Sequence, residues 1–163
     1  MKTIWFCGDN EETLTTIAEI VGEELINREQ CVELIVHSEV SEILGRGLKD
    51  TEEDKSTFTQ RLGFLGNLLH RNNAFALIIS KDAFLNDRKV IKETYGNYLQ
   101  VTIGNKDSLC NLALEVKDDS KINAKKIIDH LIKEQIIPEE CQSIYSKEEE
   151  EEIRRRLEEL GYV

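Results

Sequence analysis

The chain has 163 residues, of which 40% are hydrophobic and 33% are charged, so it is long enough for one globular domain and too apolar for a disordered chain. Its formal net charge is −11 at pH 7. A field of that sign repels nucleic acids and anionic membranes, and it opposes ATP binding unless a local basic pocket overrides it. We therefore expect neither a nucleic acid nor a membrane as a partner.

The cysteines and histidines give no sign of a metal or redox motif. Cys7, Cys31, Cys110 and Cys141 form no C-x-x-C pair, and none of them lies near a histidine at metal-ligand spacing. We expect no metal site, and reduced cysteines that are mostly buried. We recognise no signal peptide and no apolar stretch near the ~18 residues of a membrane span. These observations indicate a cytoplasmic protein.

Short apolar runs alternate with longer segments of helical periodicity. In chain order the pattern predicts a strand at 3–7, a helix at 14–25, a strand at 32–36, a helix at 58–69, a strand at 75–79, a helix at 82–95, strands at 98–103 and 112–116, and a helix at 124–132. The run at 75–79 is apolar throughout, which is typical of a strand buried on both faces. We expect Trp5 to pack in the core.

This alternation predicts an α/β fold, a three-layer α/β/α sandwich with a mainly parallel five-stranded sheet. Ligands bind such sheets at the carboxyl ends of the strands, so the turn at 8–13 is the first candidate site. We place a domain at 1–137 and, from Pro138, a linker with a charged helix at 138–163. His37 follows the second strand, where we expect a turn, with a ligand contact as the alternative.

The charged segment at the end of the sequence has the pattern of a helix. Ser146 and Glu149 form a capping box, and Gly161 is a natural cap. The acids at 150–152 each stand four residues before an arginine at 154–156, the favourable order for helix ion pairs. Its apolar stripe consists of Ile153, Leu157 and Leu160. The helix either docks on its own domain or contacts a partner chain.

The turn after the first strand aligns with the phosphate-binding motif G-x-x-x-x-G-K-[ST], whose glycines wrap phosphates and whose lysine neutralises them. Gly8 supplies the first glycine, but Thr13 stands in place of the second and Leu14 in place of the lysine. Thr15, followed by Thr16, supplies the hydroxyl. Three acids within 9–12 repel a triphosphate. The loop therefore argues against phosphoryl transfer.

Further matches surround this loop. They are the run Thr3-Ile4-Trp5-Phe6, the segment with Leu48, Glu53, Asp54 and Arg61 in which Lys55 replaces an arginine, the pair Phe84 and Arg88, and Cys110. In these residues the chain resembles the adenylylsulfate kinase family, which phosphorylates adenosine 5′-phosphosulfate with ATP, over about 2–133. The resemblance implies a fold of the P-loop kinase type.

The chain also departs from the family pattern. Besides Leu14 and Thr13, Ser41 stands at a substrate arginine and Phe58 at a substrate asparagine. The basic lid that follows the family cysteine is missing after Cys110. The resemblance therefore implies a degenerate member, a pseudokinase without catalytic residues, because phosphate stabilisation and closure are both lost.

Two groups of candidate binding residues follow. The degenerate nucleotide loop comprises Gly8, Thr13, Leu14, Thr15 and Thr16. A candidate anion or substrate site comprises Arg46, Lys55, Arg61, Phe84 and Arg88, whose family counterparts lie near the substrate.

We expect a non-catalytic protein that acts by binding, through self-association as a homodimer or through a regulatory protein contact linked to sulfate activation. Two alternatives stay open: a sensor of an adenine nucleotide or of (3′-phospho)adenylylsulfate, and residual or altered adenylylsulfate kinase activity. No cofactor is expected, and ATP with magnesium enters only if the nucleotide pocket survives.

Overall fold

The computed structural model describes residues 2–80, 85–96, 98–104 and 107–139, together with 152, 154–156 and 158. The strands and helices within these residues, in chain order, are β1 (Thr3–Cys7), α1 (Glu11–Asn27), β2 (Val32–Val36), α2 (His37–Leu44), α3 (Glu52–Arg71), β3 (Phe75–Ile79), α4 (Leu85–Tyr95), β4 (Leu99–Ile103), β5 (Leu112–Leu114) and α5 (Ser120–Lys133).

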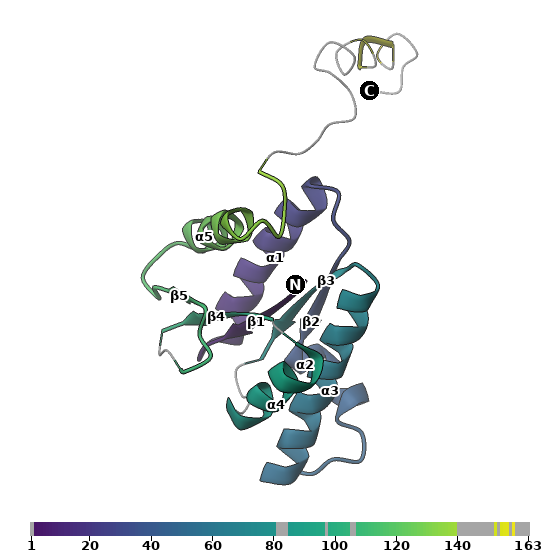
Figure 1. Cartoon of the computed structure of the whole chain (residues 1–163), viewed down its shortest axis with the longest axis vertical. Helices are drawn as coiled ribbons and strands as arrows, with labels where there is room; N and C mark the ends of the chain where they lie inside the picture. The colour runs from purple at the N-terminus through teal and green to yellow at the C-terminus, as the bar shows by residue number, and fades with distance from the viewer. Residues whose placement is uncertain are drawn as a thin grey trace.

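The five strands form one sheet in the order β2-β3-β1-β4-β5, and all its neighbouring strands are parallel. Helices α1 and α5 pack together over one face, and α3 and α4 pack together over the other (Figure 1). The predicted three-layer α/β/α sandwich with a parallel five-stranded sheet is confirmed.

Two apolar clusters, one on each side of the sheet, form the core. Phe6 packs with the residues of α1 and α5, whereas Trp5 points to the other face and packs with those of α3 and α4. Both side chains are fully buried, and so is the whole of β3, as the sequence predicts. Helices α3 and α4 approach closely at Gly63, where an added Cβ would lie 2.6 Å from the side chain of Ile91.

The structure differs from the sequence prediction at three places. Helix α2 follows β2 directly and begins at His37, so the turn expected there is wrong. Strand β5 ends at Leu114, and Val116, which the prediction included, is exposed. Of the described cysteines, which are all free, only Cys7 is buried, while Cys31 is exposed, so the expectation of mostly buried cysteines is wrong.

The segment after α5 is attached to the end of α1. The guanidinium of Arg28 donates hydrogen bonds to the carbonyl oxygens of Pro138 at 2.7 Å and Glu139 at 2.9 Å.

Further on, the predicted i,i+4 ion pair between Glu152 and Arg156 is present at 3.1 Å. The domain boundary at 138 stays a prediction. The capping box, the apolar stripe, the cap at 161, and the acids at 150 and 151 lie outside the described residues.

None of the helices within the described ranges is both long enough and apolar enough to cross a lipid bilayer.

The end of α5 provides a test of the fold. Gln135 is exposed and has a φ of +55°, a left-handed conformation that strains any residue with a Cβ. Gln135→Gly should therefore raise the free energy of unfolding by about 0.5 kcal/mol, after the entropy that glycine adds to the unfolded chain. Urea denaturation measures this change. The neighbouring Glu134→Gly, at a φ of −81°, is the control and should lower stability. A loss in both variants would contradict the assigned turn.

Candidate functional site

Only three residues, Gly8, Asp9 and Asn10, separate β1 from α1. Asn10 is the N-cap, and its side-chain oxygen accepts a hydrogen bond from the backbone N–H of Thr13 at 3.0 Å. Glu11 and Glu12 lie in the first turn, where their charges suit the helix dipole. Most of the segment that aligns with the phosphate-binding motif is therefore wound into α1.

The functional groups expected of this motif are engaged within the fold. Leu14, at the lysine position, is 1% exposed and belongs to the core between α1 and the sheet. The hydroxyl of Thr15 donates to the carbonyl oxygen of Glu11 at 2.8 Å, and that of Thr16 donates to Glu12 at 2.9 Å. Both hydroxyls therefore bond within the helix. Because Leu14 stands at the lysine position, the motif also offers no cation to an anion.

The residues of this turn do not fit ATP with magnesium. A phosphate-binding loop needs backbone N–H groups that curve around the phosphates and a lysine that reaches them. Here Asn10 caps the helix, the position of the lysine is in the core, and Asp9, Glu11 and Glu12 surround the turn with negative charge. We derive no phosphoryl transfer through this loop.

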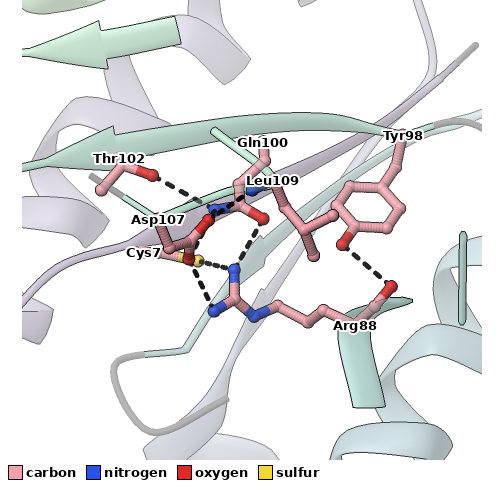
Figure 2. A network of polar contacts seen from close by, with 7 residues as sticks. All are labelled: Cys7, Arg88, Tyr98, Gln100, Thr102, Asp107 and Leu109. Carbon is pink, nitrogen blue, oxygen red and sulfur yellow. Dashed lines mark hydrogen bonds and ion pairs between the residues drawn. The ribbon is translucent and has the colours of Figure 1, made fainter. Parts of the chain in front are cut away.

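A second polar cluster lies beside the turn, where the carboxyl end of β1 meets Gln100 of β4 (Figure 2). Its centre is the guanidinium of Arg88, a residue only 5% exposed, which donates to Gln100 Oε1 at 2.6 Å and to Cys7 Sγ at 3.5 Å. Its other arm forms an ion pair with Asp107 at 2.9 Å. The hydroxyl of Tyr98 donates to the backbone carbonyl of Arg88 at 3.1 Å. The cluster is closely bonded and lies largely beneath the surface.

The electrostatics of this cluster follow from burial and from the charge of Arg88. Burial opposes ionisation of Asp107, but hydrogen bonds from the backbone of Leu109, from Arg88 and from Gln100 outweigh it and lower the pKa of the carboxyl group. Burial raises the pKa of the Cys7 thiol to about 11, so this thiol stays protonated at neutral pH and is a poor nucleophile. Burial also raises the pKa of Tyr98.

An open cavity of about 740 Å³ lies between α2 and the first half of α3, at the carboxyl end of β2. Its lining comprises His37, Ser41, Gly45, Leu48, Lys49, Asp50, Glu52, Asp54, Lys55, Phe58 and Thr59. The rings of His37 and Phe58 pack with their centroids 4.6 Å apart, and the imidazole Nδ1 lies 3.3 Å from the hydroxyl of Ser80. The volume is sufficient for a small organic ligand.

The charges of this cavity nearly cancel. Its lining has two lysines, at 49 and 55, and three acids, at 50, 52 and 54, which sum to a formal charge of −1 with His37 neutral. Lys55 is in an ion pair with Asp50 at 2.8 Å. Asp54 accepts hydrogen bonds from the backbone N–H of Lys49 and from the hydroxyl of Thr51. The cavity therefore lacks the positive charge that a multiply charged anion requires.

One of the predicted anion-binding residues lines this cavity, and the other described ones have partners or places elsewhere. Lys55 lines the cavity, but Arg46, Arg61 and Arg88 are not among its lining residues. Arg46 is exposed, Arg61 donates to the carbonyl oxygen of Leu44, and Arg88 is held in the cluster described above. Phe84 lies outside the described residues. The convergence of these side chains on one anion stays a prediction.

Sequence reasoning did not single out Gln100 or Asp107. One signal was present, since Gln100 interrupts an otherwise apolar start to its strand, and a polar side chain in a buried strand needs a partner. Gln100 is fully buried and donates to both carboxylate oxygens of Asp107. Across the part of the chain that the structure describes, no group of three or more His, Cys, Asp or Glu side chains is placed to hold a metal ion.

A parallel sheet of this order, with a site at the carboxyl end of β1, defines a domain of the P-loop kinase fold, and solved structures agree. The chain superposes with a TM-score of 0.70 and 18% identity on an adenylylsulfate kinase from Mycobacterium tuberculosis, covering 80% of this chain and 96% of that one. For a hexameric adenylylsulfate kinase from Thiobacillus denitrificans the TM-score is 0.73 at 18% identity, covering 85% of this chain and 30% of that longer one.

Sequence comparison identifies the family. The adenylylsulphate kinase model matches residues 1–127. The chain is 30% identical to the adenylyl-sulfate kinase of Rippkaea orientalis over 99% of this chain and 93% of that protein. It is 29% identical to a probable adenylyl-sulfate kinase of Synechocystis, over 66% of this chain and 61% of that protein. The chain belongs to the adenylylsulfate kinase family.

The burial of Leu14 gives a prediction. Leu14→Lys should lower the free energy of unfolding by about 3 kcal/mol or more, because a charged side chain would replace a core residue. It should not create a response of the melting temperature to ATP. Thr16→Lys, at an exposed position one half-turn further on, is the control and should change stability little. A stable Leu14→Lys variant that melts higher with ATP would contradict the structure of this turn.

Asp107 gives a pH-dependent prediction. Because its pKa is lower in the folded chain than the usual 3.8, its ionised form stabilises the fold at pH above that value, and this contribution is lost as the pH falls through the lowered folded pKa. Asp107→Asn should therefore be less stable than the wild type at pH 7, and the difference should shrink below about pH 4. Urea denaturation at a series of pH values measures it, with Asp9→Asn in the exposed turn as the control. A difference that stays constant across this range would show that ionisation is not the cause.

Proposed function

We propose that this chain is a non-catalytic member of the adenylylsulfate kinase family, one that acts by binding rather than by transferring phosphate. The observation that carries the proposal is the winding of the phosphate-binding segment into α1, with Leu14 buried where the family has its lysine. Phosphoryl transfer depends on electrostatic stabilisation of the phosphates, and this turn offers acids in its place. The named relatives are kinases, so the loss of activity is proposed for this chain alone.

Self-association is the first form of binding to test. One solved neighbour is described as a hexameric kinase of this family. Helix α3 of this chain also exposes two large apolar residues one turn apart, Phe64 at 51% and Leu68 at 42%. Apolar side chains grouped in this way are typical of protein contacts. A regulatory contact with the sulfate-activation machinery is the alternative within the same proposal.

A second candidate function is the sensing of an adenine nucleotide or a phosphosulfate. It is favoured by the cavity of about 740 Å³ beside α2 and α3, where Lys55 keeps the positive charge of the family arginine that it replaces. It is disfavoured by the cavity's formal charge of −1. A ligand with several negative charges would have to displace Asp50 from Lys55. On this balance, binding of a protein partner ranks first and sensing second.

An assay of ATP-dependent conversion of adenylylsulfate tests the proposal directly. The purified chain should give no product above the rate without enzyme, whereas the kinase of Rippkaea orientalis, run in parallel, serves as the positive control. Saturable turnover that scales with the concentration of this chain would refute the non-catalytic proposal. Light scattering on the same sample measures the mass in solution and detects self-association.

Thermal shift separates the two binding functions. ATP, ADP, adenylylsulfate and its 3′-phosphorylated product are each titrated with and without magnesium, because a ligand that binds only the folded state raises stability by RT ln(1 + [L]/Kd). The expected result is no shift at millimolar ligand. A saturable shift that Lys55→Ala abolishes and Arg46→Ala, outside the cavity, retains would establish the sensor instead.

A further inference from the structure

The guanidinium of Arg88 is fixed in place by groups other than its ion-pair partner. Gln100 Oε1 accepts from it at 2.6 Å, Cys7 Sγ lies at 3.5 Å, and the hydroxyl of Tyr98 holds its backbone carbonyl at 3.1 Å. All of these belong to buried parts of β1 and β4 or to the residue just before β4. The guanidinium therefore has bonding partners on β1 and β4 besides Asp107.

Asp107 is the part of the cluster that lies on a loop. It belongs to the connection between β4 and β5, and its side chain is 25% exposed, against 7% for that of Arg88. Its backbone carbonyl accepts a long bond from the N–H of Cys110 at 3.3 Å. The carboxylate is therefore the more solvent-accessible partner of the ion pair.

The groups that hold this carboxylate are all donors. Asp107 accepts from the guanidinium of Arg88 at 2.9 Å, from the amide of Gln100 at 2.9 and 3.0 Å, and from the backbone N–H of Leu109 at 2.8 Å. A guanidinium, an amide and a backbone N–H that converge on one point are also the set that holds a sulfate or phosphate group. The cluster lies beside the carboxyl end of β1, and this type of sheet binds ligands at the carboxyl ends of its strands.

From these three observations we propose that Arg88 and Gln100 form an oxyanion site whose resident occupant is the chain's own Asp107 carboxylate. A sulfate or phosphate group enters only when Asp107 leaves. The described part of the β4–β5 connection from 107 onward is thereby bonded to Arg88 and Gln100 through an internal anion, and an oxyanion ligand of sufficient affinity would release Asp107. The proposal does not rest on the loss of kinase activity, because it concerns Arg88 and Gln100 rather than the turn at 8–10.

The test removes the internal anion and offers an external one. Asp107→Ala, the wild type and Asp118→Ala are titrated with sodium sulfate, sodium phosphate or sodium formate, with the ionic strength held constant by sodium chloride. Asp118 is a matched control because its side chain is 22% exposed and forms an ion pair with Lys126 at 2.6 Å. The readouts are the melting temperature and the fluorescence of Trp5, which is the only tryptophan and packs 5.7 Å from the ring of Tyr98.

We expect Asp107→Ala to melt below the wild type in chloride and to recover much of that loss with sulfate or phosphate along a saturable curve. The wild type and Asp118→Ala should show only the gradual rise that these salts give any protein by exclusion from its surface. Asp107→Asn, whose amide still fills the position, should not recover. Comparison of the sulfate and phosphate midpoints then tells which tetrahedral group the site prefers.

Several results would overturn the proposal. One is a response of Asp107→Ala to sulfate and phosphate that equals that of Asp118→Ala. Another is recovery with formate alone, because the site would then accept a planar carboxylate and not a tetrahedral oxyanion. If Asp107→Ala does not fold in chloride, refolding supports the proposal when it occurs at sulfate or phosphate concentrations that do not stabilise Asp118→Ala. Failure to fold in all the salts, while Asp107→Asn folds, contradicts it.

Discussion

The burial of β1 between β3 and β4 is the constraint on which the rest of the molecule depends. Its backbone pairs with a parallel strand on each side, and Trp5 and Phe6 are completely buried on opposite faces. A strand of this kind needs a helical layer on both faces of its sheet. Its direction also decides where chemistry can occur, because the turn at 8–10, Arg88 and Ser80 all gather where β1 and its neighbours end.

Apolar periodicity was sufficient to predict most of this fold, because the strands and helices bury continuous runs and stripes. It failed where burial is partial. Helix α2 is short, has no fully buried residue and begins at His37 without a capping side chain, so its beginning gives little signal in the sequence, although Val40, Ile43 and Leu44 follow helical spacing. Strand β5 is short and lies at the edge of the sheet, and therefore Val116, although apolar, extends beyond it into solvent. These elements depend on their neighbours more than on their own sequence.

Of the candidate site, the sequence predicted only which motif residues are missing. The replacement of a glycine and a lysine by Thr13 and Leu14 can be read from the motif, but the outcome for the backbone cannot. The residues that stand in place of the motif tolerate a helical backbone. Helix α1 therefore begins at Glu11, with Asn10 as its N-cap, and includes most of the segment that aligns with the phosphate-binding motif. The Asp107 carboxylate, from a loop without periodicity, meets Arg88 only in three dimensions. Pairings between a loop and a helix leave no local pattern to detect.

The attachment of the chain at Arg28 lies at the opposite end of the domain from the candidate sites. Helix α1 starts at the carboxyl edge of the sheet, beside Arg88, and ends at the opposite edge, where Arg28 holds the carbonyl oxygens of Pro138 and Glu139. The described chain after α5 therefore lies on the side of the domain away from the cavity and the Arg88 cluster. It leaves the carboxyl edge of the sheet uncovered, so a ligand or partner that binds there meets no residue of 134–139.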